Sequence, residues 1–128
     1  MRYLGIDYGK KKIGLAVAAT TISEVYGTLM VSSDTDALKK IGEVIKKENI
    51  SEIVVGISEG QMAKDSKYFI EKLKDKFKLP VHMQDETLTS KAAQFLSIQA
   101  GIKRKKRKRL EDAYSASLIL QNYLDEKA

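Results

Sequence analysis

Apolar and polar positions alternate near the start of the chain, a pattern that is typical of half-buried β-strands. The alternation covers residues 3–8 and 12–18, and Gly9 with the lysines after it turns the chain between them. These two segments therefore predict a β-hairpin. Residues 24–32 predict a third strand that continues the meander.

Two later segments predict strands of another kind. Residues 52–57 read Glu-Ile-Val-Val-Gly-Ile, a continuous apolar run that is expected of a strand buried on both faces. Pro80 precedes a shorter strand over residues 81–84. Because the first of these strands is apolar on both sides, helices are expected to cover both faces of the sheet.

Apolar residues three or four positions apart predict four helices. They span residues 34–48, 63–78, 88–100 and 110–126. Asp34 or Asp36 can cap the first helix, and Gly101 is a natural stop for the third. The resulting order, β-β-β-α-β-α-β-α-α, predicts a single α/β domain over residues 1–128 with a mixed sheet.

Positive charge is concentrated in one segment. The chain has 23 Lys and Arg against 17 Asp and Glu, and seven of these cations are consecutive. They are Lys103, Arg104, Lys105, Lys106, Arg107, Lys108 and Arg109. Because like charges repel, the run is expected at the surface between the last two helices, where it would bind nucleic-acid phosphates. Lys10, Lys11 and Lys12 are a weaker signal of the same kind. A solvated loop and a solvated turn are the alternatives.

Composition excludes several kinds of chemistry. The chain has no cysteine, which rules out disulfides and thiol catalysis, and its single His82 lies inside a predicted strand, where a structural role is expected. No apolar run approaches the ~20 residues of a membrane span. Asp7 interrupts the first apolar segment too early for a signal peptide. We therefore expect a cytoplasmic protein that does not bind membranes.

Asp7 stands inside the first predicted strand, between Gly5 and Gly9. An ionised carboxylate in an apolar strand is costly unless it is paired or bound to a cation. The two glycines lie two positions before and after it, on the same face of the strand, and leave room for a ligand or a backbone segment. The alternative is an aspartate that caps the turn at the end of the strand.

Further carboxylates lie at the ends of other predicted elements. Asp85 and Glu86 directly follow a strand, where sites of open α/β sheets form, although Asp85 or Thr87 could equally cap the next helix. Asp112 lies near the start of the last helix, on its core-facing side, and could instead favour the helix dipole. Oxygen ligands without nitrogen suit Mg²⁺ or Mn²⁺, so the residues together predict metal-dependent phosphoryl transfer on nucleic acid.

Four segments resemble the YqgF/RuvX family, the RuvC-like branch of the ribonuclease H superfamily. They are Leu-Gly-Ile-Asp-Tyr-Gly-Lys-Lys-Lys-Ile-Gly-Leu-Ala-Val (4–17), Ile-Val-Val-Gly (53–56), Asp-Glu-Thr-Leu-Thr-Ser (85–90), and residues 105–124 from Lys-Lys-Arg-Lys to Asn-Tyr-Leu. The resemblance implies a ribonuclease H-like fold with a five-stranded mixed sheet in the order 3-2-1-4-5. It places the family's catalytic, metal-binding acids on Asp7, Glu86 and Asp112, with Mg²⁺ or Mn²⁺ as the cofactor.

The resemblance implies a metal-dependent nuclease. Its substrate would be the 5′ end of precursor 16S ribosomal RNA or, alternatively, a four-way Holliday junction of DNA, and it would act as a monomer or weak homodimer. Thr87 stands where the family usually has arginine, and the loop after Gly56 is shorter than usual. Two other classes compete: a non-catalytic nucleic-acid-binding module, and an actin-like ATPase or sugar kinase, whose phosphate loop resembles Gly-Ile-Asp-x-Gly but which needs two such domains.

Overall fold

The computed structural model describes the backbone of residues 2–57, 61–85 and 104–127. The described residues form five strands: β1 (Tyr3–Asp7), β2 (Lys12–Ala18), β3 (Glu24–Met30), β4 (Glu52–Ile57) and β5 (Val81–Asp85). They also form three helices: α1 (Asp34–Glu48), α2 (Gln61–Phe77) and α4 (Arg104–Lys127). The helix predicted over residues 88–100 lies outside the described residues.

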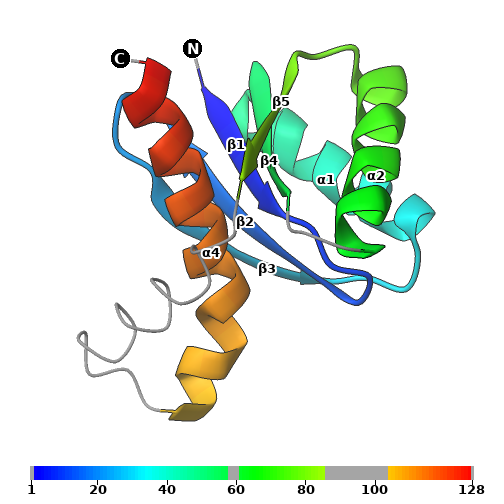
Figure 1. The fold of residues 1–128 in the computed structure, drawn as a ribbon, viewed down its shortest axis with the longest axis horizontal. Coiled ribbons are helices and arrows are strands. Elements are labelled where there is room, and N and C mark those ends of the chain that lie inside the picture. The colour runs from blue at the N-terminus through cyan, green and yellow to red at the C-terminus, as the bar shows by residue number, and fades with distance from the viewer. Residues whose placement is uncertain (1, 58–60, 86–103, 128) are drawn as a thin grey trace.

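The five strands form one mixed sheet in the order β3-β2-β1-β4-β5 (Figure 1). β1 pairs with β2 and β2 with β3 in antiparallel fashion, as the predicted meander requires. β4 pairs in parallel with both β1 and β5. The predicted fold class and strand order, 3-2-1-4-5, are confirmed.

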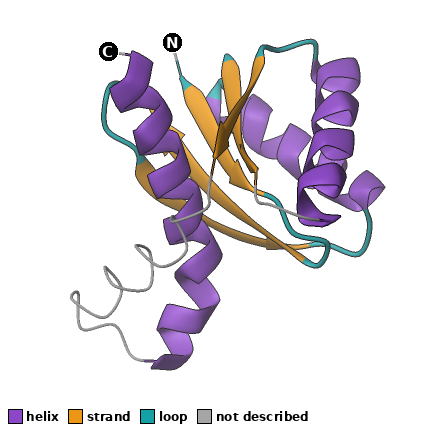
Figure 2. Ribbon diagram, viewed as in Figure 1, coloured by secondary structure: helices purple, strands orange, loops and turns teal. Residues whose placement is uncertain are grey.

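Helices cover both faces of the sheet, as predicted (Figure 2). α1 and α2 lie on one face and α4 crosses the other. Alternation along β1 divides its side chains between the two sides: Leu4 and Ile6 pack towards α1 and α2, whereas Tyr3 packs towards α4. Each face therefore has its own layer of apolar side chains.

The two apolar layers differ in side-chain size. The layer under α1 and α2 is built from large residues, among them Leu4, Ile6, Ile13, Leu15, Ile41, Ile53, Phe69 and Leu73, all fully buried. The layer under α4 includes the small residues Ala16, Ala18 and Ala116 beside Val54, Ile119 and Leu120. The small side chains under α4 leave room for this helix to approach the sheet closely.

The predicted N-cap of the first helix, Asp34 or Asp36, was wrong. Ser33 is the N-cap: its hydroxyl accepts a hydrogen bond from the Asp36 N–H at 3.1 Å. Asp36 in turn accepts the Ser32 N–H at 3.0 Å, and this bond lowers the pKa of its carboxyl. Asp34 and Asp36 thus occupy the first turn, where negative charge favours the helix dipole.

The largest departure from the prediction is the start of the last helix. α4 begins at Arg104 and not at residue 110, so most of the basic run is helical and does not form a loop between helices. Lys and Arg are good helix formers, and repulsion between like charges four residues apart costs only a few tenths of a kcal/mol per pair. No proline or glycine interrupts the segment between Arg104 and Asp112.

Candidate functional site

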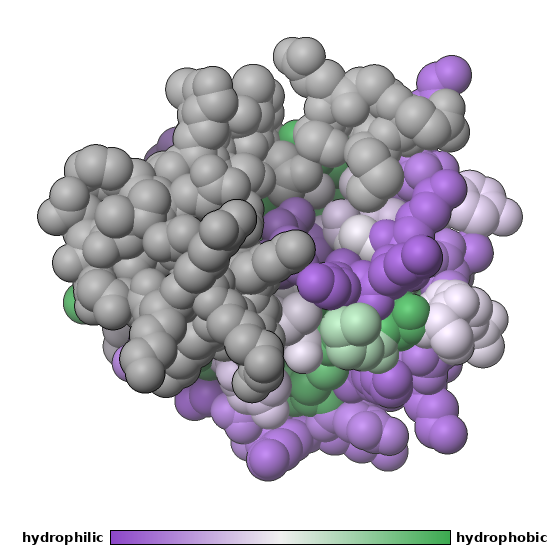
Figure 3. All heavy atoms as spheres, turned by 90° about the horizontal axis from the view of Figure 1, so that it is seen from below, coloured by the Kyte–Doolittle hydropathy of each residue, from purple (hydrophilic) through white to green (hydrophobic). Residues whose placement is uncertain are grey.

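Asp7 is the last residue of β1, and its place in the sheet follows from the strand directions. β1, β4 and β5 run parallel, so their carboxyl ends lie at one edge of the sheet. This is the edge at which open α/β sheets bind ligands. Asp7 is half-buried there. Figure 3 views the molecule from this end and shows hydrophilic side chains over much of its described surface.

Gly14 lies directly opposite Asp7 in the hairpin. A Cβ atom at Gly14 would overlap the carbonyl oxygen of Asp112 and would lie 2.8 Å from the backbone nitrogen of Ala113. The backbone of α4 therefore rests directly on β2. Residues directly opposite in an antiparallel pair have Cβ positions ~4.5–5.5 Å apart on the same face, so Asp7 projects beside the point where Asp112 meets the sheet.

A second glycine lets α4 lie on β1 in the same way. A Cβ at Gly5 would come within 2.8 Å of the Leu120 Cβ and 2.9 Å of the Ala116 carbonyl oxygen. The space that the sequence predicted beside Asp7 is thus taken, at Gly5, by a helix backbone. Contacts at both glycines hold α4 close to two neighbouring strands.

Hydrogen bonds from the loop between β2 and β3 fix the position of α4 along the sheet. The Ser23 hydroxyl donates to the Ser117 carbonyl at 2.6 Å, and the Ser23 N–H donates to Gln121 Oε1 at 2.9 Å. The Gln121 amide donates to the Thr21 carbonyl at 2.9 Å. Ser117 and Gln121 lie about one and a half and two and a half turns from Asp112, so these bonds resist both sliding and rotation of the helix at that residue.

A cluster at the opposite edge of the sheet holds the C-terminal end of α4. Lys127 Nζ donates to the Tyr3 hydroxyl at 2.8 Å and lies 3.7 Å from Glu52 Oε2. The hydrogen bond with Tyr3 raises the pKa of Lys127. His82 stacks on Tyr123 with ring centroids 4.8 Å apart. This packing agrees with the structural role expected for His82.

Two of the three predicted acids are described. Asp7 and Asp112 come together at Gly14, and both are half-buried. Glu86 lies outside the described residues, and so does the side chain of Asp85, which ends β5. Asp112 is the ninth residue of α4, so the alternative of an acid serving the helix dipole was wrong, because the dipole acts only within the first turn.

The two carboxylates are chemically suited to a hard divalent cation. Mg²⁺ in proteins keeps several waters and is held by one or two carboxylates together with substrate phosphates. Asp7 and Asp112 supply oxygen ligands of this kind. Among the side chains that the structure describes, no group of three or more His, Cys, Asp or Glu could hold a metal ion. A third acidic ligand would have to come from outside them.

The predicted basic residues are only partly described by the structure. Lys10 follows β1 and approaches Asp65 of α2 at 3.4 Å, and Lys11 and Lys12 are exposed. Lys103 lies outside the described residues. The cations from Arg104 to Arg109 occupy the first turns of α4, but their side chains are outside the described part. The structure thus corrects their backbone from loop to helix.

Sequence reasoning missed Gly14, which brings the two acids together. The signal was present: a glycine in a strand marks a close backbone approach, and the hairpin register puts this one opposite Asp7.

The hydrogen bond of the buried Tyr8 was also missed by sequence reasoning. Tyr8 points away from α4, its hydroxyl donates to Asp34 Oδ1 at 2.7 Å, and burial followed by the Asp34 carboxylate raises its pKa.

Comparison with known families and proteins matches nearly the whole chain. The model of the RuvX family, described as Holliday junction resolvase, matches residues 1–126. A protein of Leuconostoc citreum is 36% identical over 136 residues, which cover 98% of this chain and 95% of that protein. One of a Geobacillus species is 37% identical over 137 residues, 99% of each chain. Both carry the name "Putative pre-16S rRNA nuclease".

Solved structures share the fold at low sequence identity. RuvC of T. thermophilus in complex with a Holliday junction substrate matches with a TM-score of 0.61 and 16% identity, over 99% of this chain and 95% of that one. The fowlpox virus Holliday junction resolvase matches with a TM-score of 0.66 and 14% identity over 100% of each.

A sugar kinase structure bears on the kinase alternative. A "putative sugar kinase" from Cytophaga hutchinsonii matches with a TM-score of 0.53 and 13% identity, over 74% of this chain but 39% of that one. This chain therefore resembles only a part of a kinase.

None of the helices that the structure describes has the length and apolar character of a membrane-spanning segment.

Proposed function

The chain belongs to the RuvX family, and from this we propose that it is a nuclease that needs a divalent cation and trims the 5′ end of precursor 16S ribosomal RNA. The observation that carries the proposal is the meeting of β1, β2 and α4 at Gly14. Asp7 lies opposite this glycine and the backbone of Asp112 rests on it. Two half-buried acidic residues thereby lie close to each other at the edge where open α/β sheets bind ligands, and this supports the proposal.

In the proposed mechanism Asp7 and Asp112, with Glu86, hold Mg²⁺ or Mn²⁺. The bound cation would lower the pKa of the attacking water and offset the charge that develops on the phosphate. The chain's own contribution is to position the carboxylates. Asp7 is held by the strand pairing at the end of β1, and Asp112 by the close packing of α4 on Gly14. Lys10, Lys11 and Lys12, with the basic run, supply charge to hold the phosphate backbone.

We favour precursor ribosomal RNA as the substrate because relatives with the higher sequence identity are named as nucleases of this RNA. The relatives named for it are 36–37% identical over almost the whole of both chains, whereas the resolvase structures are only 14–16% identical. Holliday junction resolution is the second candidate, and the family description favours it. Symmetric cutting of a four-way junction needs two active sites, whereas a monomer can process an RNA end.

A cleavage assay distinguishes these functions. The purified protein is incubated with a 16S precursor fragment that carries a 5′ extension, or with a four-way DNA junction, in Mg²⁺, Mn²⁺ or EDTA. We expect metal-dependent trimming of the RNA and slower or no cutting of the junction. Preferred cutting of the junction by a dimer would favour the second candidate. Binding without cleavage in any metal would identify a non-catalytic module and contradict the proposal.

A further inference from the structure

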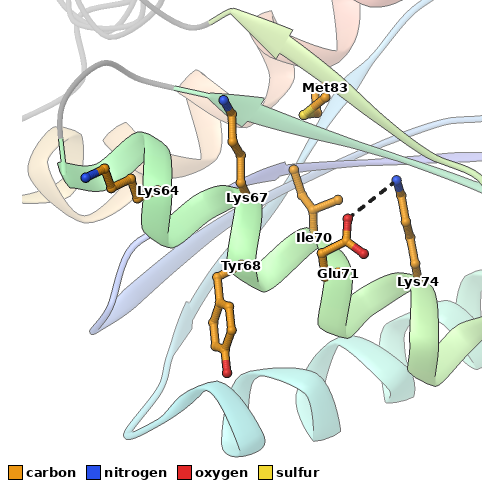
Figure 4. A pocket seen from close by; sticks show the side chains of 7 residues that line it. All are labelled: Lys64, Lys67, Tyr68, Ile70, Glu71, Lys74 and Met83. Carbon is orange, nitrogen blue, oxygen red and sulfur yellow. Dashed lines mark ion pairs between the residues drawn. The ribbon is translucent and has the colours of Figure 1, made fainter.

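The outer face of α2 carries a row of charged residues that the proposed mechanism does not use. Lys64, Lys67, Glu71 and Lys74 recur three and four positions apart, so they share one face of the helix. Together with Tyr68, Ile70 and Met83 they line an open hollow of about 560 Å³ between α2 and β5 (Figure 4). We call Lys64, Lys67 and Lys74 the α2 lysine row.

Positive charge in this hollow is poorly compensated. The structure gives Lys64 and Lys67 no ion pair with any described residue, and Lys74 approaches Glu71 only at 4.0 Å, with both side chains well exposed. Three cations thus face one anion. Figure 4 shows Lys67 and Lys74 extending to the same side of the helix, with Ile70 between them. Successive phosphates of one strand could therefore contact these lysines without displacing any strong pair.

The hollow also exposes apolar surface. Met83 is 57% exposed although it lies on a strand, and Tyr68 is 65% exposed. β5 is an edge strand, and Met83 pairs in register with Val55, whose side chain is buried under α1 and α2. Met83 therefore points to the face that these helices cover, at a place where α2 leaves it open. A purely solvated helix face would not explain an exposed methionine beside lysines whose charge the described residues leave largely uncompensated.

The lysine row starts near the same edge of the sheet as the candidate site and leads away from that edge. α2 begins soon after β4 ends, at the edge that carries Asp7, and the pair between Lys10 and Asp65 joins its first turns to the turn after β1. From Lys64 to Lys74 the helix rises ~15 Å. A strand that leaves Asp7 along α2 would meet first Lys64 and Lys67, then Lys74.

We propose that the α2 lysine row binds the phosphates of the substrate strand that flanks the cleavage point, and that Met83 contacts an unpaired base of that strand. The proposal rests on the proposed function, since it assigns a path to that substrate. Lysine ammonium groups bind phosphates as point charges, and apolar side chains accept the faces of unstacked bases. An acidic protein segment would also match the charge of the row. The substrate strand is favoured because the row begins near the edge of the sheet that carries Asp7.

Binding is measured with the whole protein in EDTA, so that no cleavage occurs, on a single-stranded RNA and an RNA duplex across a salt series. Lys64, Lys67 and Lys74 are changed together to Gln. For single strands each lost phosphate contact flattens the slope of log affinity against log salt by about 0.7, so we expect a total change of about 2. Glu71→Gln should tighten binding several-fold, because it removes the one acidic side chain that lines the hollow.

The matched control changes three exposed lysines of α1, Lys39, Lys46 and Lys47, together to Gln. It alters net charge equally, and we expect less than a third of the change in slope. If the α2 variant binds RNA as the α1 control does, the inference is wrong. If the unaltered protein neither binds nor cleaves RNA, the proposed function fails first.

Discussion

The two faces of the sheet are packed by different means. Under α1 and α2, large side chains such as Phe69 and Leu73 fill the space between helix and strand. Under α4, Gly5 and Gly14 let the helix backbone touch the strands themselves. The first kind of packing depends on apolar volume and mainly sets stability. The second fixes distances between backbones, and it occurs at the face where Asp7 and Asp112 meet.

The comparison predicts that stability and activity can be altered separately. A cavity on the side of α1 and α2 should weaken the fold without moving the carboxylates. A small displacement on the side of α4 should change cleavage more than stability.

Phe69→Ala should cause the largest loss of stability. Phe69 is fully buried and stacks on Tyr8 with ring centroids 4.5 Å apart. Its truncation leaves a cavity, and such changes cost about 3–5 kcal/mol. Chemical denaturation measures the loss. Cleavage per folded molecule, measured well below the unfolding midpoint, should stay within about twofold of the unaltered protein. A far larger loss of cleavage would show that the two faces are not independent.

Asp7→Asn should leave stability nearly intact and reduce cleavage by about a hundredfold or more, which corresponds to roughly 2.7 kcal/mol of transition-state stabilisation. Asn keeps the shape of the side chain but removes the charge that would hold a divalent cation. Single-turnover cleavage in Mn²⁺ is the measurement, with thermal unfolding as the check on folding. Cleavage at the original rate by a well-folded variant would remove Asp7 from the site.

Gly14→Ala should cost about 1–3 kcal/mol of stability, the usual penalty of overpacking, and should reduce cleavage further than that loss explains. The added methyl group would overlap the backbone of Asp112, so α4 must move away from Asp7. Gly42→Ala is the matched control on the other side of the sheet. There the new Cβ meets only the end of the Phe77 ring, at 3.1 Å, and alanine favours the helix by up to about 1 kcal/mol. We expect that control to be neutral or slightly stabilising.

Tyr8→Phe should have the smallest effect, about 1 kcal/mol at neutral pH, because it removes one hydrogen bond to Asp34. Lys72 still pairs with Asp34 at 3.1 Å. The pKa of Tyr8 is raised in the folded chain, so its contribution is complete below the ordinary tyrosine value and is lost as pH rises above about 10. Between about pH 9 and 11, on either side of the ordinary tyrosine pKa, the free energy of unfolding should fall less for the variant than for the unaltered protein. Tyr68→Phe, at an exposed position, should match the unaltered protein.

Much of the fold could be predicted from periodicity alone. Alternation over residues 3–8, strand-forming residues after them and a turn at Gly9 indicated the hairpin of β1 and β2, and the continuous apolar run of β4 correctly predicted helices on both faces. The strand order came from resemblance to the family, because alternation does not say which strands are neighbours. The start of α4 was missed because charge repulsion was weighted above the good helix propensity of Lys and Arg.

The candidate site was predictable where a single residue broke its local pattern. Asp7 stood out because a carboxylate is costly in an apolar strand. Gly14 did not stand out, because glycines are common and its importance depends on the register with Asp7 and on a helix about a hundred positions later in the chain. Contacts between segments so far apart are determined by the whole fold, so no local pattern reports them.

The continuity of α4 fixes the distance between its first residues and Asp112. One unbroken helix carries Arg104 at its beginning and Asp112 in its third turn, and eight residues of α-helix span about 12 Å. A phosphate held at the start of the helix would thus be kept at a set distance from the acid, with no hinge between them. Adding or removing a full turn in this interval would move that phosphate by about 5.4 Å without rotating it around the axis. In the proposed nuclease, the length of this helical segment would thus set the distance between the bound phosphate and the point of cleavage.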